Sequence, residues 1–412
     1  MRKPLPGSYD APRLMAFEIL QQLARSRSFA DEALDRAFLA APELRPLDRS
    51  FIHELVLGVL RWRGQLDWMI RQVLKSPQKK PNPRVQDILR LGVYQIYHLD
   101  RVPPSAAVNE SVRLAKAVLG DEKIAGFVNA ALRTILRRKE NFVFPALEKE
   151  PLEHLVSVLS HPRWIAARWL KEFGAEAAAR ICLADNSPPP WTLRVNTLKI
   201  TRERLSADLG NLRLFTRPTP FSPAGLVAAR NPFVEGSDLF QRGLFFLQDE
   251  ASQIVSYALQ PQPGERILDA CAAPGGKATH LAQLMENQGE ILAFDLNEKK
   301  TRLIPENAER LGISIIKGLP GDAGRLLALE AGSRFDRILV DAPCTGLGTL
   351  HRNPEAKWNR KEGDPRRLQN LQLALLQNVS ASRICSWPCT VATDACASRR
   401  KRYRSPALRS QN

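Results

Sequence analysis

Residues 266–277 read R-I-L-D-A-C-A-A-P-G-G-K, an apolar run that ends in a loop of small residues. The run predicts a buried strand, and a helical pattern follows at 279–285. Strand, loop and helix alternate again downstream, with strands expected at 291–295, 313–317 and 335–341. This alternation predicts a parallel, doubly wound, Rossmann-like α/β sheet, in which ligands bind at the carboxyl ends of the strands.

Small and acidic residues follow each expected strand, so they should meet at one edge of the sheet. The glycines let the backbone pass close to a ligand, and the next helix offers unpaired N–H groups at its start. Asp295, which closes the second strand, is placed to accept hydrogen bonds from the two hydroxyls of a ribose. The candidate cofactor-binding residues are Cys271, Ala272, Ala273, Pro274, Gly275, Gly276, Lys277, Asp295, Asp322 and Asp341.

The loop chemistry narrows the class of cofactor. Neither the G-x-G-x-x-G spacing of dinucleotide sites nor the G-x-x-x-x-G-K-[ST] phosphate loop occurs in the sequence. S-adenosylmethionine carries a ribose and an amino acid but no phosphate, and it fits this loop better. Taken singly, the glycine pair could be a tight turn and Asp295 a helix cap. Their alignment over four successive strands favours a cofactor site.

Charge and composition indicate the class of partner. The chain has 412 residues, a formal net charge of +17 and a pI near 9.9, which favours a polyanion such as RNA over a membrane surface. No apolar run is long enough for a membrane span and no secretory signal is visible, so we expect a cytoplasmic monomer with no membrane partner. The six cysteines lack both CxxC pairs and neighbouring histidines, so no metal site is expected.

Four segments with different patterns divide the chain. Residues 1–145 have apolar residues at helical spacing and predict an all-α domain. Residues 146–255 predict a helical linker followed by a small α+β module, and residues 256–378 the partial Rossmann-like core. Residues 379–412 form a basic tail without a strand pattern.

Several motifs resemble those of a known enzyme family. DACAAPGGKATH, FDLNEKK, GDA and DAPCTGLGTLHRNPEAKW are similar to motifs of the S-adenosylmethionine-dependent RNA cytosine-C5 methyltransferases, in particular the bacterial branch that acts on 16S rRNA. The helical first domain resembles the RNA-binding NusB domain found in that branch. QDEAS at 248–252 resembles the stretch before the catalytic core.

The resemblance implies a mechanism with two catalytic candidates, Asp341 and Cys344. Cytosine C5 is a poor nucleophile, so a cysteine thiolate first adds to C6 and makes C5 able to attack the methyl group. In the family, the aspartate at the position of Asp341 lies beside the cofactor and the target base. The cysteine at the position of Cys344 acts in release of the methylated RNA, and the attacking thiol comes from a later T-C-S motif.

That later motif is absent from this chain. After Asn378 the family pattern stops, which suggests a truncated or frameshifted C-terminus, and Cys389 in P-C-T is the nearest substitute thiol. Reading the gene in the other two frames beyond codon 378 tests the frameshift. Without the fifth strand of the family, we expect residues 335–341 to form an open, apolar sheet edge and the chain to be poorly soluble.

Three functions compete at this stage. The first, which we favour, is an rRNA cytosine-C5 methyltransferase. The second is a catalytically impaired RNA-binding protein that lacks the T-C-S nucleophile. The third, a methyltransferase of small molecules or proteins, fits poorly with the net charge of +17 and the helical first domain.

Overall fold

The computed structural model describes residues 10–26, 28–74, 81–229, 237–322, 335–380 and 390–392. The chain divides into two compact units, which we describe separately. The first unit consists of the chain up to Pro188 together with Thr349–Glu362. The second unit consists of Pro189–Gly348 and the chain from Gly363 onward. The finer four-part division expected from the sequence stays a prediction.

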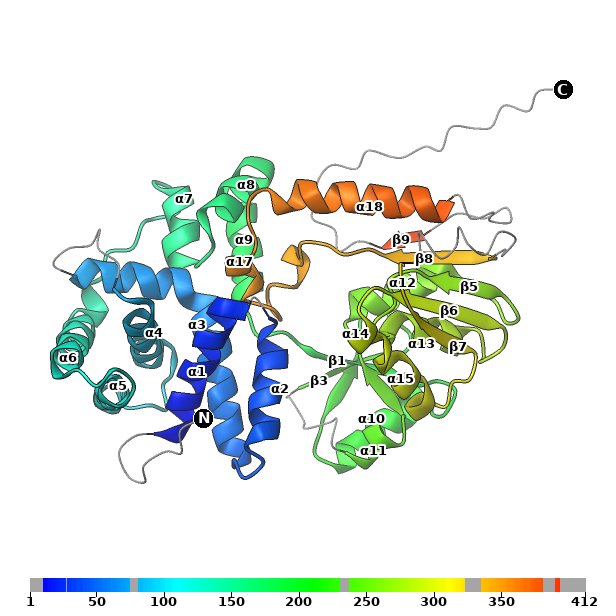
Figure 1. Cartoon of the computed structure of the whole chain (residues 1–412), viewed down its shortest axis with the longest axis horizontal. Coiled ribbons are helices and arrows are strands. Elements are labelled where there is room, and N and C mark those ends of the chain that lie inside the picture. Colours follow the sequence, from blue (N-terminus) through cyan, green and yellow to red (C-terminus); the bar gives the residue numbers. More distant parts are fainter. Residues whose placement is uncertain are drawn as a thin grey trace. The chain divides into compact units, whose positions relative to one another are not determined.

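The first unit is all-helical in its described residues, as expected (Figure 1). Its helices are α1 (Ala11–Ser26), α2 (Ala30–Ala40), α3 (Pro46–Val73), α4 (Pro83–His98), α5 (Pro104–Leu119), α6 (Glu122–Arg137), α7 (Pro151–Glu153), α8 (Arg163–Phe173), α9 (Ala175–Asn186) and α17 (Ala356–Asn359), with short turns η1 (Lys139–Asn141) and η2 (His154–Val158). Local signals set the ends: Pro104 opens α5, Gly120 closes it in the left-handed conformation, and Asp121 caps the amides of α6.

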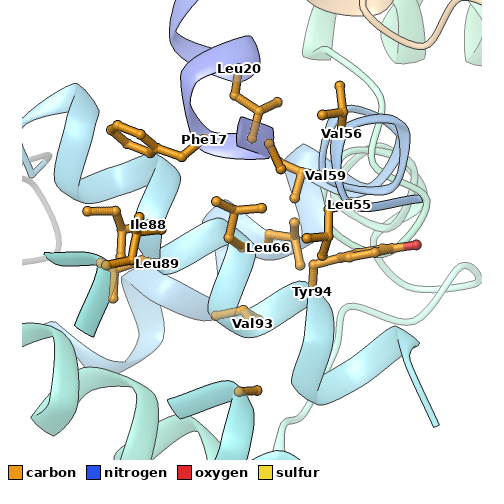
Figure 2. Close-up of a cluster of buried hydrophobic side chains, with 14 of the residues drawn as sticks. Phe17, Leu20, Leu55, Val56, Val59, Leu66, Ile88, Leu89, Val93 and Tyr94 are labelled. Atoms are coloured by element: carbon orange, nitrogen blue, oxygen red, sulfur yellow. The ribbon is translucent and has the colours of Figure 1, made fainter. Parts of the chain in front are cut away.

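The apolar faces of α1, α3 and α4 make the core of this unit. Figure 2 shows Leu55 and Val59 of α3 pointing toward the side chains of α1 and α4. Gly58 lets the Tyr94 ring lie against α3, because a Cβ at Gly58 would lie 2.0 Å from that ring. The Tyr94 hydroxyl donates a 2.5 Å hydrogen bond to Glu54, so the ring is held by both packing and a polar contact.

The segment Thr349–Glu362 packs into the first unit although its neighbours in sequence belong to the second. Lys357 is fully buried there, and its ammonium donates to Asn186 Oδ1 at 2.6 Å and to the Arg61 carbonyl at 3.3 Å. Burial lowers the pKa of Lys357 to about 7 and raises that of neighbouring Asp185 to about 7. The segment is therefore anchored by a buried polar cluster in addition to apolar contacts.

The second unit begins with a small antiparallel sheet in the order β2-β3-β1-β4. Its elements are β1 (Trp191–Val195), α10 (Arg202–Asn211), β2 (Thr216–Pro218), β3 (Gly225–Ala228), α11 (Asp238–Gln241) and β4 (Phe245–Leu247). Leu193, Leu205 and Phe245 are among the buried residues of its core. This is the α+β module that the sequence predicts.

A five-stranded parallel sheet follows, in the order β7-β6-β5-β8-β9 (Figure 1). Its elements are α12 (Glu250–Leu259), β5 (Arg266–Asp269), α13 (Gly276–Leu284), β6 (Glu290–Asp295), α14 (Glu298–Thr301), α15 (Leu303–Leu311), β7 (Ile316–Pro320), β8 (Arg337–Asp341), the turn η4 (Leu347–Thr349), α18 (Asp364–Ser380) and β9 (Thr390–Ala392). The predicted Rossmann-like class is thereby confirmed.

Successive strand residues face opposite sides of this sheet, as period-two alternation requires. Ile267 and Leu339 join a core with residues of α13 and α15, whereas Leu268 and Val340 join a second core that includes Val379 of α18. Because both faces are covered there, the central residues of β5, β6 and β8 are apolar. Among the described helices, none combines the length and apolarity that crossing a bilayer requires.

Two strand predictions need correction. The third strand begins at Ile316 rather than Ile313, because Gly312 closes α15 in the left-handed conformation and Ile313 packs into the core before the strand starts. The prediction of an open sheet edge at residues 335–341 is also wrong for Leu339–Asp341, because these residues pair with β9. Three residues are too few to leave an alternating pattern in the sequence.

Candidate active site

The loop after β5 lies at the carboxyl edge of the parallel sheet. It turns tightly, with the Gly275 amide donating to the Ala272 carbonyl at 2.7 Å, and Gly275 has φ of +100°. A Cβ at Gly275 would lie 3.3 Å from Ile304 Cα, so the turn needs glycine for both its conformation and its close approach to α15. The loop leads directly into α13, whose first amides face this edge.

A pocket of about 250 Å³ opens beside this loop. Its lining residues are Phe246, Leu247, Gln248, Asp249, Ser252, Asp269, Cys271, Ala272, Ala273, Pro274, Gly276, Lys277 and Asp341. Most of the cofactor-binding candidates from the sequence are thus brought together. Asp295 joins them indirectly, since one of its carboxylate oxygens accepts a 3.1 Å hydrogen bond from the Ala273 amide and the other accepts from Asn297.

Negative charge dominates this pocket. Lys277 Nζ lies 2.5 Å from Asp341 Oδ2 and is the cation among the lining residues. Burial raises the pKa of the Cys271 thiol to about 12, and the charges of Asp269, Asp295, Asp341 and Asp322 add to the rise. Four carboxylates therefore lie close enough to the Cys271 thiol to act on it electrostatically. Their negative charge at this edge of the sheet disfavours binding of a pyrophosphate and favours a cationic ligand.

Asp269, at the end of β5, is a site residue that sequence reasoning missed. It is fully buried, and among the described residues neither carboxylate oxygen has a partner with good hydrogen-bond geometry, although the neighbouring Cys271 amide is close enough to lower its pKa. Burial, followed by the charge of Asp341, raises its pKa to about 7, while Lys277 opposes the rise. A buried carboxylate without a partner is costly to the fold, so it marks a place where a ligand can supply the missing cation or donor. Its position directly before the small-residue loop was the available signal.

A second missed group, Arg194 of β1, supports the loop from the antiparallel sheet. Its guanidinium donates at 2.5 Å to Gln248 Oε1 and at 2.5 Å to the Gly276 carbonyl, and at 2.9 Å to Thr279 Oγ1. Burial lowers its pKa to about 9. Because these bonds join β1 to both the pocket wall and the start of α13, Arg194 fixes the shape of the loop after β5. A lone arginine in a strand gave no sequence signal for this role.

Cys344 and Asp322 lie at the same sheet edge but are not among the residues that line the pocket. Cys344 follows β8 on the loop that leads to η4, and the Gly346 amide points at its sulfur at 3.4 Å. The same loop is held by α18, since Gln372 donates to the Pro343 carbonyl at 3.0 Å. Cys389, the substitute thiol considered from the sequence, lies outside the described residues.

Three family descriptions match the chain. Residues 10–137 match the NusB family, residues 161–234 match an RsmF/B-like ferredoxin-like domain, and residues 256–383 match the 16S rRNA methyltransferase RsmB/F family. The matches cover the helical unit, part of the antiparallel sheet and most of the parallel sheet in chain order.

Individual proteins are similar over longer stretches. A probable ribosomal RNA small subunit methyltransferase B of Bacillus subtilis is 37% identical over 368 residues, which cover 89% of this chain and 81% of that protein. Among solved structures, PH0851 has a TM-score of 0.75 at 25% identity, and the match covers 95% of this chain and 87% of the PH0851 chain. NSun6 from Pyrococcus horikoshii, solved with SFG, has a TM-score of 0.52 at 25% identity and covers 56% of this chain and 83% of its own.

Proposed function

The chain belongs to the 16S rRNA methyltransferase RsmB/F family, and we propose that it methylates C5 of a cytosine in 16S rRNA with S-adenosylmethionine as methyl donor. Membership confirms the family resemblance of the sequence and makes the protein an rRNA methyltransferase. The choice of cytosine C5, the thiolate route and the residue roles are our proposal. The observation that carries it is the cluster of carboxylates around Cys271 at the carboxyl edge of the sheet.

The charge of the pocket supports this cofactor. S-adenosylmethionine supplies a methyl group on a positively charged sulfur and also carries an ammonium group. Asp269, which is buried in the pocket wall, and Asp341 would face those cations, while Asp295 would take the ribose hydroxyls. The relative NSun6 was solved with SFG, an analogue of S-adenosylmethionine, which agrees with this assignment.

Asp341 is the proposed acid next to the target base. Lys277 holds its carboxylate at the pocket, and after Asp341 takes up a proton its carboxyl O–H would donate to N3 of cytosine and assist addition of a thiolate to C6. The C6–S bond forms, C5 takes the methyl group as the sulfur–methyl bond of the donor breaks and the donor leaves as the neutral thioether, a base removes the C5 proton, and the C6–S bond breaks to restore the aromatic ring. The RNA base must leave its stack to reach this edge.

The two thiols at this edge differ in their suitability for covalent chemistry. Cys271 has a pKa raised to about 12, so it holds its proton at neutral pH and is a poor nucleophile. Cys344, on the loop after β8, is the proposed thiol for release of the methylated RNA. The missing T-C-S motif favours, as the second candidate function, RNA binding without turnover.

Methyl transfer from labelled S-adenosylmethionine to 16S rRNA tests the proposal. The Cys344→Ala variant should accumulate a denaturant-stable protein–RNA adduct if another thiol attacks C6, and should lose both adduct and transfer if Cys344 attacks itself. Cys182→Ala, which removes a thiol of α9 outside this pocket, is the matched control and should do neither. Wild-type protein that binds the donor and RNA but transfers no methyl group to cytosine would exclude the proposed reaction and leave the RNA-binding alternative.

A further inference from the structure

The first unit contains a pocket of about 460 Å³, separate from the carboxyl edge of the sheet. Helices α1, α3 and α4 and the segment around α17 line it. Its volume falls in the range typical of small-molecule sites. One wall is apolar, with Leu20, Leu23, Leu60 and Ile70 among its residues.

A fixed aromatic ring and a guanidinium lie side by side in this pocket. The indole N–H of Trp358 donates to the Leu60 carbonyl at 2.6 Å, which sets the position of the ring. The Arg63 guanidinium carbon lies 5.2 Å from the centroid of the Trp358 ring. Indole rings and guanidinium planes are the surfaces on which unpaired RNA bases stack.

Two of the three guanidinium groups that line the pocket lack a carboxylate at ion-pair distance among the described residues. Arg90 forms ion pairs with Asp67 at 2.7 Å and with Asp87 at 2.6 Å, so this cluster of one guanidinium and two carboxylates keeps one excess negative charge. In the described chain, no carboxylate lies within ion-pair distance of Arg63 or Arg71, and both line the pocket. Burial and the charge of Arg90 lower the pKa of the Arg63 guanidinium, and the charges of Asp67 and Asp87 offset this shift only in part.

A buried carboxyl group in the pocket wall also lacks a full set of partners. Glu355 is 3% exposed; its Oε1 accepts a 3.2 Å hydrogen bond from the Ala30 amide, and its Oε2 has no hydrogen-bond partner among the described residues. An apolar wall, a stacking ring, two guanidinium groups that take no part in the ion pairs and an unsatisfied acceptor together match the parts of a nucleotide. The base is planar and carries hydrogen-bond donors, and the phosphate is anionic.

We propose that this pocket binds one unpaired nucleotide of the RNA substrate, away from the methylated base. The base would lie against Trp358 and the apolar wall, and the phosphate would pair with Arg63 and Arg71. The inference rests on the proposed function in that it takes RNA as the substrate. An RNA strand is favoured over a protein segment because of the Arg63–Trp358 stacking pair, the guanidinium groups that form no ion pair among the described residues, and the net charge of +17.

A pocket-filling variant of the full chain tests the proposal. Ala24 lines the pocket and is exposed, so Ala24→Leu narrows the space without removing a polar contact. Ala130→Leu, at an exposed position of α6 outside the pocket, is the matched control. Fluorescence anisotropy with a labelled stem-loop RNA should show a roughly tenfold higher Kd for Ala24→Leu, the loss expected for one stacked base, and an unchanged Kd for the control.

Two further measurements separate the possible ligands. Arg63→Gln should weaken RNA binding and lower the slope of log K against log salt by about 1, as loss of one phosphate contact requires. If Ala24→Leu binds RNA with the same Kd as the wild type, the proposal is overturned. It is also overturned if RNA binding is unchanged but AMP or UMP binds the wild type and not the variant. That last result would show a site for free nucleotides.

Methyl transfer distinguishes failure of this inference from failure of the proposed function. Ala24→Leu should raise KM for RNA and leave kcat unchanged at saturating RNA. If the wild type transfers no methyl group but Ala24→Leu still weakens RNA binding, the pocket assignment stands and the proposed reaction fails. If transfer is normal and KM is unchanged in Ala24→Leu, the reaction stands and the pocket assignment fails.

Discussion

Replacing Asp269 by Asn should stabilise the protein and weaken its affinity for S-adenosylmethionine. The Asp269 carboxylate is fully buried and has no well-formed hydrogen bond in the described part of the chain, so its charge opposes folding. The same charge would attract the cationic donor. If Asp269 serves binding at a cost in stability, its replacement should raise the free energy of unfolding and lower the affinity for the donor. If it has a packing role, its replacement should lower both quantities.

The pKa of Asp269 gives the size and the pH range of the effect. The folded pKa, about 7, lies above the ordinary value of 3.8, so the folded state holds this proton more tightly than the unfolded state. Wild-type stability should therefore fall as pH rises from 3.8 to about 7 and stay level above that. A shift of about 3 units corresponds to about 4 kcal/mol. The amide of Asn also lacks partners, at about 1–3 kcal/mol, so the expected net gain at pH 8 is roughly 1–3 kcal/mol.

Urea unfolding at pH 5 and pH 8 and calorimetric titration with S-adenosylmethionine measure both effects. Asp269→Asn should raise the unfolding midpoint more at pH 8 than at pH 5, and should weaken donor binding roughly tenfold or more. Wild-type affinity should increase between pH 6 and 8 as Asp269 ionises, and the variant should lose that increase. Glu309→Gln, at an exposed site on α15, removes the same charge and should change neither property. A destabilised Asp269→Asn variant with unchanged donor affinity would refute the reasoning.

Three other substitutions test the fold around the two sites. Lys357→Met should destabilise the first unit by roughly 3–5 kcal/mol in urea unfolding, because it leaves Asp185 and Asn186 without their buried cation, and adding Asp185→Asn should restore much of the loss. Gly243→Ala should cost about 3 kcal/mol or more, measured in the same way, since its Cβ would lie 1.8 Å from the Arg310 carbonyl oxygen at a φ of +68°. Gly275→Ala should lower the free energy of unfolding by roughly 1–2 kcal/mol, because φ at this position is +100° and the added Cβ would lie 3.3 Å from Ile304 Cα. It should also weaken donor binding in calorimetry. An unchanged affinity would argue against the loop as the cofactor site.

The sequence by itself determined the alternation of strands and helices along the parallel-sheet region and the helical character of the first unit. Both depend on local patterns: apolar periodicity distinguishes strand from helix, and glycine, proline and capping residues mark the ends. It also placed Asp295 and Asp341 at one sheet edge, because parallel strands that alternate with helices bring their carboxyl ends together.

Only the tertiary structure decided which of these groups are buried, paired or unsatisfied. The raised pKa of Asp269, the bonds of Arg194 to the cofactor loop and the pairing of β9 with β8 depend on atoms far apart in the sequence. The same holds for Lys357, whose segment continues the active-site motif yet packs among residues of α3 and α9. Local patterns fix backbone conformation, but the free energy of a charge depends on its surroundings in three dimensions, and no short motif records those.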